Sequence, residues 1–232
     1  MVSFGLELTT PIYYYKLETT LHRVFNSIDL KQGGRFYGAQ YQQLNKEQRN
    51  GILINGSPVV EIDYSGMHMR MLYHLSSLQY EGDPYSFVGD NKELRKIYKL
   101  AGLILINAKN ITEAKRGFND ELRKRLPIRG FTKVKSYLEF LGFSQPSDVF
   151  ENLMKHHEPI SHHFNTGSGI GLTLQNYDSL IADKVLYHFT KRNIPCLCVH
   201  DSFIVPKTHA EDLKSIMIQS YQAILNFTPI LK

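Results

Sequence analysis

Two apolar segments that each end at an aspartate constrain the fold more than any other feature of this 232-residue sequence. Ile52-Leu53-Ile54 and Val59 to Asp63 flank Asn55-Gly56, a preferred two-residue turn, so the first segment is predicted to be a β-hairpin. Ile194 to Val199 and Ser202 to Val205 flank His200-Asp201, which predicts a second hairpin with the polar pair at its tip. Each hairpin therefore places a carboxylate at a strand end, where the side chain can leave the core and meet a ligand.

The remaining periodicity is mostly helical. Apolar residues recur at intervals of three and four between these hairpins and after them, which is typical of amphipathic helices. Asp90 followed by Glu93 resembles a capping box, and Pro127 and Gly130 are expected to separate shorter helices within residues 111 to 143. The helices expected span residues 10–30, 65–78, 92–107, 173–191 and 210–225. Strands around a mostly helical middle give an α+β fold with an antiparallel sheet.

Composition and charge exclude several classes of protein. The chain is 42% hydrophobic and 21% charged, so it can bury a core and is not disordered by composition. The formal net charge of +5 permits a nucleic-acid partner without establishing one. No apolar stretch approaches the ~18 residues of a membrane span, and the first residues lack a signal-peptide pattern. We therefore expect a cytoplasmic protein with no membrane partner.

Asp63 and Asp201 are the candidate metal ligands. Two carboxylates from different strands can bridge a pair of Mg²⁺ ions ~3.5–4 Å apart, as phosphoryl transfer requires, and Mn²⁺ is a candidate substitute. On periodicity alone, a cap or turn role is the more ordinary interpretation of each aspartate. The exact residues around them favour the metal site.

Residues 61 to 75, EIDYSGMHMRMLYHL, resemble the first catalytic motif of family A DNA polymerases. In that motif an Asp-Tyr-Ser triplet closes a strand, an Arg follows five residues after the Ser, and a His-Leu pair comes later in the helix. Asp63-Tyr64-Ser65, Arg70 and His74-Leu75 occupy these positions. Residues 199 to 203, VHDSF, resemble the third motif, and the His-Asp-Ser order is that of phage-type single-subunit RNA polymerases.

Between these two motifs, Arg95 and Lys99 match the spacing of the Arg and Lys that the family carries on a fingers helix. Residues at i and i+4 share a helix face, so both side chains can reach one triphosphate. The alternative is a solvated basic face. His68 stands where family A enzymes have a sugar-gating Glu, and Leu103 and Asn107 stand where they have aromatic residues. The resemblance implies that these three residues line the sugar and base pocket together with Tyr64, whose carbonyl is the expected third metal ligand.

Looser matches concern the DNA. Gly34-Arg35 resembles a template-primer segment, and Gln175 resembles a Gln that reads the minor groove near the primer end. The resemblance implies that primer-template DNA is contacted by Arg35, Gln175, His200 and Arg70.

The resemblance covers residues 33 to 206 and implies a right-hand polymerase palm with reduced helical fingers. The expected parts are an N-terminal segment with the first half of the palm (1–83), reduced fingers (84–170) and the second half of the palm (171–232). Only 32 residues precede Gly33, so we expect a thumb that is minimal or absent. A processivity or helicase partner is then a candidate to grip the DNA.

The function implied is that of a template-directed DNA polymerase, a nucleotidyltransferase that uses Mg²⁺ to add nucleoside triphosphates to a primer 3′-hydroxyl. Two alternatives stay open. One is an RNA polymerase or primase on the same palm, which Ser202 favours. The other is a non-catalytic nucleic-acid-binding module, which the presence of both aspartates disfavours.

Two further clusters have ordinary and functional interpretations. The basic stretch from Lys115 to Lys135 is either a solvated helix face or a surface that follows phosphates. Four histidines surround Glu158-Pro159, but the proline interrupts the helix that would align them, so a nucleotide-contacting segment is favoured over a zinc site. The histidines are His156, His157, His162 and His163.

Overall fold

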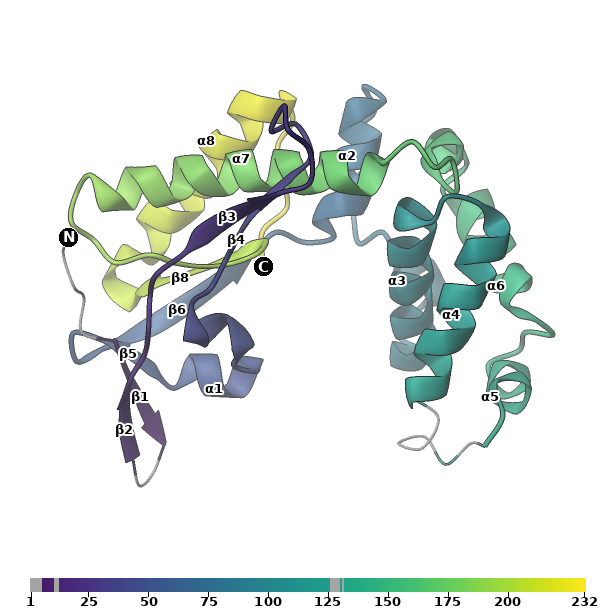
Figure 1. Ribbon diagram of the computed structural model, residues 1–232, viewed down its shortest axis with the longest axis horizontal. Helices are drawn as coiled ribbons and strands as arrows, with labels where there is room; N and C mark the ends of the chain where they lie inside the picture. The colour runs from purple at the N-terminus through teal and green to yellow at the C-terminus, as the bar shows by residue number, and fades with distance from the viewer. Residues whose placement is uncertain (1–5, 11–12, 126–129, 131) are drawn as a thin grey trace. The chain divides into compact units, whose positions relative to one another are not determined.

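The computed structural model describes residues 6–10, 13–125, 130 and 132–232. The chain forms two compact units (Figure 1). The first, named here the sheet unit, contains the described residues up to Met67 together with Leu172–Lys232. The second, the helical unit, is His68–Gly171. The chain passes from one unit to the other within helices α2 and α7, whose bounds are given below.

The sheet unit contains, among its described residues, a six-stranded sheet in the order β2-β1-β5-β6-β8-β7 and a separate two-stranded ribbon, β3-β4. Every pairing in both is antiparallel. The strands are β1 (Leu6–Thr10), β2 (Tyr13–Lys16), β3 (His22–Phe25), β4 (Gly33–Tyr37), β5 (Ile52–Ile54), β6 (Ser57–Asp63), β7 (Leu197–Val199) and β8 (Ser202–Pro206).

Both predicted hairpins form. Asn55 and Gly56 have φ values of 51° and 75°, the left-handed conformation that a tight β5–β6 turn requires and that Asn and Gly adopt most readily. In the second hairpin Val199 pairs with Ser202, which leaves His200 and Asp201 as the two-residue connection between β7 and β8. The predicted α+β class with an antiparallel sheet thus agrees with the structure.

Two long helices pack in the sheet unit, α7 (Ile170–Thr190) and α8 (Ala210–Leu225). Helix α8 contacts β6 and β8, and α7 lies beside the β3-β4 ribbon (Figure 1). Ile52, Ile54 and Ile204 are fully buried in a core that Tyr41 of the 3₁₀ turn Gln40–Gln43 joins. A short helix, α1 (Lys46–Asn50), connects that turn to β5 and is capped by a capping box between Asn45 and Gln48.

The helix expected over residues 10–30 is wrong. Strands β2 and β3 occupy that part of the chain, and β3 alternates between exposed and half-buried positions. Leu17, Val24 and Phe25 match a helical spacing, but the neighbouring tyrosines and β-branched residues favour strands. Pairing of Val24 with Arg35 across the ribbon then selects the extended conformation. Local periodicity does not reveal this pairing partner.

The helical unit packs its helices around buried aromatic and aliphatic side chains such as Phe118 and Phe150, whose ring centroids lie 5.1 Å apart. Helix α3 contacts both α4 and α6. The helices are α3 (Lys92–Asn107), α4 (Ile111–Arg125), α5 (Val134–Phe140), α6 (Pro146–His156) and the 3₁₀ segments Ser86–Val88 and Glu158–His163. Most of α2 (Met67–Leu75) also belongs to this unit.

One detail of the predicted helices differs from the structure, and another lies outside the described residues. Helix α3 has the expected bounds, but its N-cap is Asn91, whose side chain accepts from the backbone N–H groups of Glu93 and Leu94, and not Asp90. Pro127, expected to end a helix, lies outside the described residues. Within the part of the chain that is described, no helix has the length and apolar character needed to cross a membrane.

Candidate two-carboxylate active site

The pairing of β6 with β8 brings Asp63 and Asp201 to the same end of neighbouring strands. Asp63 lies opposite Ser202 in the ladder, and the backbone N–H of Tyr64 donates to the carbonyl of Asp201 over 3.1 Å. The backbones of the two aspartates therefore lie close together at one end of the β6–β8 pair, although the residues are far apart in sequence. Paired strands hold such residues more rigidly than loops do.

The donor set at this strand end fits a hard divalent cation. The Asp63 side chain is 29% exposed, and its Oδ2 already lies 3.0 Å from a cation, the Nζ of Lys232. Among the described residues no group of three or more His, Cys, Asp or Glu side chains could hold a metal ion. Two carboxylates suffice for Mg²⁺ at a phosphoryl-transfer site, because Mg²⁺ keeps several waters and takes further ligands from substrate phosphates.

Ser202 and Glu61 form a polar layer beside the two aspartates. The Ser202 hydroxyl donates to Glu61 Oε1 over 2.9 Å, and Arg49 binds the same carboxylate with two nitrogens, at 2.8 and 2.9 Å. Burial opposes ionisation of Glu61, but the hydrogen bonds from Arg49 and Ser202 outweigh it and lower the pKa of this carboxyl. Alternation along β6 puts Glu61 on the same face as Asp63, so a fixed negative charge lies next to the candidate site.

His200 occupies the turn with a φ of 56°, in the left-handed region. Its ring packs edge-on against Tyr37 with centroids 5.5 Å apart, and burial, assisted by the charges of Arg35 and Arg49, lowers its pKa. Within the described residues its buried Nδ1 has no hydrogen-bond partner. A neutral, half-buried imidazole at the tip of the hairpin suits contact with an uncharged group better than with phosphate.

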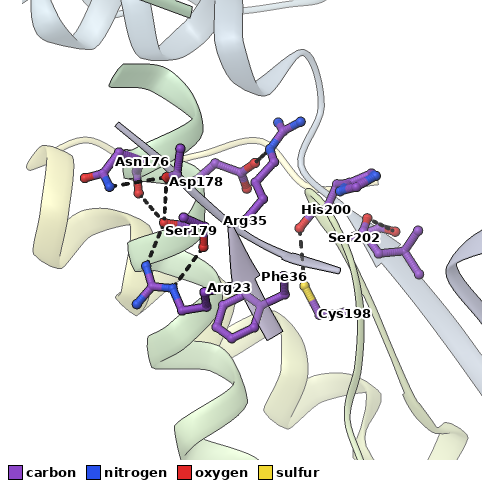
Figure 2. Close-up of polar contacts among 12 residues, drawn as sticks. Arg23, Arg35, Phe36, Asn176, Asp178, Ser179, Cys198, His200 and Ser202 are labelled. Carbon is purple, nitrogen blue, oxygen red and sulfur yellow. Dashed lines mark hydrogen bonds and ion pairs between the residues drawn. The ribbon is translucent and has the colours of Figure 1, made fainter. Parts of the chain in front are cut away.

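Arg35, predicted to contact DNA, is held by a residue that was not among the predicted site residues. Its Nε lies 2.6 Å from Oδ2 of Asp178, which is buried within α7 (Figure 2). The Arg35 side chain retains 18% exposure. Asp178 thus fixes the orientation of the Arg35 side chain in β4, and only a minor part of that side chain stays accessible.

Asp178 lies in an environment that disfavours its charge. Burial raises the pKa of its carboxyl to about 6, with the negative charge of Asp201 acting in the same direction and Arg35 opposing both. A sequence signal for this residue exists. Leu174, Asp178, Ile181 and Val185 recur at helical spacing, so Asp178 is a charge within an otherwise apolar stripe.

Gly34 permits the close approach between β4 and α7 that this ion pair needs. Its φ is +90°, and a Cβ there would lie 2.7 Å from the Phe25 ring and 2.8 Å from Ser179 Oγ. Arg23 completes the junction, because it donates to the Gly34 carbonyl and to Ser179 Oγ, both over 2.9 Å (Figure 2). Only glycine fits this position.

Two predicted site residues have buried side chains with partners inside the protein. Tyr64 is 2% exposed and donates its hydroxyl to the Met217 carbonyl over 2.6 Å, so its ring belongs to the core of the sheet unit, and the nucleotide contact expected of it remains a prediction. Its carbonyl stays a predicted metal ligand. Arg70 is equally buried and donates to the carbonyls of Tyr80 and Gly82, so its side chain orders the loop after α2, and the DNA contact expected of it remains a prediction.

The predicted nucleotide-contacting residues of the helical unit share one stripe of α3. Lys99, Leu103 and Asn107 are exposed at intervals of four residues. Arg95 begins this stripe, but its guanidinium is bound to Asp83, with Nε at 3.0 Å from Oδ2, and it stacks over Tyr85. Lys99 makes no ion pair among the described residues. His68, at the start of the unit, and Gln175, on α7, are half-buried, and the roles expected of them remain predictions.

Two clusters singled out in the sequence have partners of their own. In the basic stretch, Arg123 pairs with Asp120 and Lys124 with Glu121 at helical spacing, so part of its charge is neutralised locally. His157 is fully buried, with one ring nitrogen 2.8 Å from the Tyr73 hydroxyl and the other 2.8 Å from the Pro84 carbonyl. Burial lowers its pKa to about 4, so the ring is neutral, and because both ring nitrogens are hydrogen-bonded neither is available to a zinc ion.

No protein family matches this sequence, and no curated protein matches it either. Among solved structures, the chain is similar to the POL domain of Pol1 from M. smegmatis, determined in complex with DNA primer-template and dNTP. The two share 12% sequence identity with a TM-score of 0.43, over 86% of this chain. The chain spans 44% of the length of that polymerase chain. At this level of likeness, the function has to be argued from the residues of the site.

Proposed function

We propose that the chain is a template-directed DNA polymerase that adds nucleotides to a primer 3′-hydroxyl by a two-metal mechanism. The observation that carries this proposal is the pairing of β6 with β8, in which Tyr64 N–H donates to the Asp201 carbonyl and Asp63 lies opposite Ser202. Two carboxylates on adjacent strand ends are what a phosphoryl-transfer site with two divalent ions requires.

In this proposal Asp63 and Asp201 hold both metal ions, and the Tyr64 carbonyl is a further ligand. Two bound Mg²⁺ ions, or Mn²⁺ in their place, would supply activation of the attacking hydroxyl and neutralisation of the leaving pyrophosphate. The chain's own contribution is to hold the carboxylates on paired strands, so little reorganisation accompanies the reaction. Glu61 stays bound to Arg49 and Ser202 and keeps its charge beside the site.

The remaining residues are proposed to bind the two substrates. Arg35 and Gln175 are the proposed contacts to primer-template DNA, and the Asp178 carboxylate fixes the orientation of the Arg35 guanidinium. Arg95 and Lys99 are the proposed ligands of the triphosphate, which requires Arg95 to exchange its partner Asp83 for phosphate. Both substrates are polyanions, so the net charge of +5 favours their approach.

His68 is the proposed sugar gate, with Leu103 and Asn107 as neighbours in the nucleotide pocket. A bulky imidazole and an apolar side chain leave a ribose 2′-hydroxyl without a partner, and an unpaired buried hydroxyl costs roughly 1–3 kcal/mol. That penalty corresponds to a preference for deoxynucleotides of about one to two orders of magnitude. This is the reason to propose a DNA polymerase first.

An RNA polymerase or primase is the second candidate, and Ser202 is the observation that favours it. Family A DNA polymerases usually have His-Asp-Glu where this chain has His200-Asp201-Ser202, whereas phage-type RNA polymerases have Ser. The Ser202 hydroxyl donates to Glu61, so a Glu in its place would bring two carboxylates together. Glu61 of β6 therefore favours a hydroxyl over a carboxylate at position 202 of β8.

A primer-extension assay tests the proposal. A labelled primer annealed to a DNA template is incubated with the protein, Mg²⁺ and either dNTPs or NTPs. Extension with dNTPs at least tenfold faster than with NTPs supports the first candidate, and the reverse preference supports the second. Binding of the primer-template without extension by either nucleotide set, with Mg²⁺ or Mn²⁺, would leave a non-catalytic nucleic-acid-binding module.

A further inference from the structure

Residues 230–232 pair with the end of β6, beside the candidate metal ligand Asp63. Ser65 N–H donates to the Ile230 carbonyl over 2.8 Å, and Tyr64 forms an isolated antiparallel bridge with Leu231. Asp63 and Lys232 then exchange two backbone hydrogen bonds, each 3.0 Å long. Asp63 is therefore bounded by β8 on one side and by Lys232 on the other.

This register determines where the Lys232 side chain lies. Directly opposed residues of an antiparallel pair project to the same face, with Cβ atoms about 4.5–5.5 Å apart. The ammonium of Lys232 accordingly reaches the Asp63 carboxylate, with Nζ 3.0 Å from Oδ2. The Lys232 side chain is 50% exposed, and its four-carbon stem is flexible. The ammonium can therefore move away from Asp63 without disturbing the backbone pair.

We propose that Lys232 is a positioning residue of the metal site, which holds the Asp63 carboxylate in the metal-free protein and competes with the first divalent ion for it. This inference rests on the proposed function, because it takes Asp63 as a metal ligand. The ammonium and the ion require the same carboxylate oxygen, and two cations on one carboxylate repel each other. Metal binding at Asp63 thus requires displacement of the ammonium.

Lys232 in this way lowers the affinity of the empty site for divalent ions. An ammonium on a carboxylate that is partly open to solvent is a weak competitor, since an exposed ion pair changes an equilibrium by about fivefold at most. Repulsion between the ion and the nearby ammonium adds to this factor. Replacing Lys232 with a neutral residue should consequently tighten metal binding by about fivefold or more.

Titration with Mn²⁺ alone, followed by electron paramagnetic resonance of the free ion, tests this inference in the full chain without nucleotide or DNA. The variants are Lys232→Gln, which removes the charge, Lys232→Arg, which keeps it, and Asp63→Asn, which removes the ligand. We expect Lys232→Gln to bind Mn²⁺ at least fivefold more tightly than wild type, Lys232→Arg to bind like wild type, and Asp63→Asn to bind much more weakly. Thermal unfolding of each variant without metal checks that the fold is retained.

Failure of the inference about Lys232 and failure of the metal assignment give different Mn²⁺ affinities. Equal Mn²⁺ affinity of wild type and Lys232→Gln, with weak binding by Asp63→Asn, would overturn the role of Lys232 and leave the metal site of the proposed function intact. Equal affinity of wild type and Asp63→Asn would overturn the metal assignment and the inference with it. If Lys232→Arg binds as tightly as Lys232→Gln, the competition does not come from the charge and the inference is wrong.

Discussion

Replacing Asp178 with Asn should stabilise the protein at neutral pH, although it removes one partner of a buried ion pair. Burial and the charge of Asp201 raise the pKa of Asp178 from 3.8 to about 6, in spite of the bond to Arg35. Since a tenfold change in an ionisation constant is worth about 1.4 kcal/mol, this shift corresponds to about 3 kcal/mol. Asn keeps the shape of the neutral acid and avoids that penalty.

The pH window follows from the sign of the shift. Below pH 3.8 the carboxyl is protonated in both the folded and the unfolded chain, and it contributes no pH dependence. Between pH 3.8 and about 6 only the unfolded chain loses the proton, so the stability of the wild type falls as the pH rises. Above about pH 6 the carboxyl is ionised in both states, and nearly the full free-energy cost of burying its charge is present. The amide that replaces the carboxyl in the variant does not titrate, so the difference in stability should grow across this window and then stay constant.

Urea unfolding at pH 4, 5, 6, 7 and 8, with a chelator present, measures this difference. The free energy of unfolding of Asp178→Asn minus that of wild type should rise by about 2.4 kcal/mol between pH 4 and pH 7, because part of the ~3 kcal/mol is already present at pH 4. Asp183→Asn, an exposed site on the same helix, is the matched control and should show no such trend. Other titrating groups cancel in the difference because both proteins contain them.

A competing expectation makes the experiment decisive. Removal of one partner from a buried ion pair often costs about 3–5 kcal/mol, because the other charge is left without compensation. We expect the opposite here because the Arg35 side chain retains 18% exposure and can be solvated when Asp178 is neutral. A variant that is less stable than wild type at pH 7, with a deficit that grows from pH 4 upward, would refute this reasoning.

Three further perturbations test other parts of the account. Gly34→Ala should lower the free energy of unfolding in urea by about 2–4 kcal/mol, because the backbone strain of a positive φ and a clash with Phe25 add. Gly56→Ala, which has open space around it, should lower it by only about 1 kcal/mol. Equal losses would show that the close approach at Gly34 is unimportant. Lys99→Ala should lower kcat/KM for the nucleotide about 10- to 100-fold with DNA affinity unchanged. The control Lys96→Ala should have little effect, because the Lys96 side chain pairs with Glu93. A matching loss of DNA affinity in Lys99→Ala would assign Lys99 to the DNA surface. His68→Ala should raise the ratio of ribonucleotide to deoxynucleotide incorporation by about tenfold, and an unchanged ratio in a primer-extension assay would exclude it as the sugar gate.

Local signals were sufficient for the parts of the fold that form within short segments. Asn55-Gly56 specifies a tight turn by its own backbone preference, and the apolar runs on either side of His200-Asp201 are close enough in sequence for their pairing to be predicted locally. The antiparallel sheet and the strand-end positions of both aspartates followed from these two hairpins. The pairing between the hairpins, β6 with β8, is what brings the aspartates together.

Features that depend on distant partners were not predictable in the same way. Residues 13–16 and 22–25 form strands because β2 pairs with β1 and β3 pairs with β4, which a local helical spacing cannot reveal. The partners Arg35 and Asp178 are 143 residues apart, and only the register of β6 with residues 230–232 places Lys232 on Asp63. The burial of Arg70 and of the Tyr64 ring likewise depends on packing, so a motif match identified the residues but not what their side chains contact.

The most direct test of the central claim is single-turnover addition of one nucleotide to a primer, measured for wild type, Asp63→Asn, Asp201→Asn and the control Asp183→Asn at saturating Mg²⁺. Loss of a metal-bridging carboxylate removes several kcal/mol of transition-state stabilisation, so each of the first two variants should be slower than wild type by about a thousandfold or more. Asp183→Asn should match wild type, and all four proteins should unfold at similar urea concentrations. Near-wild-type rates for either Asp63→Asn or Asp201→Asn would contradict the two-carboxylate site.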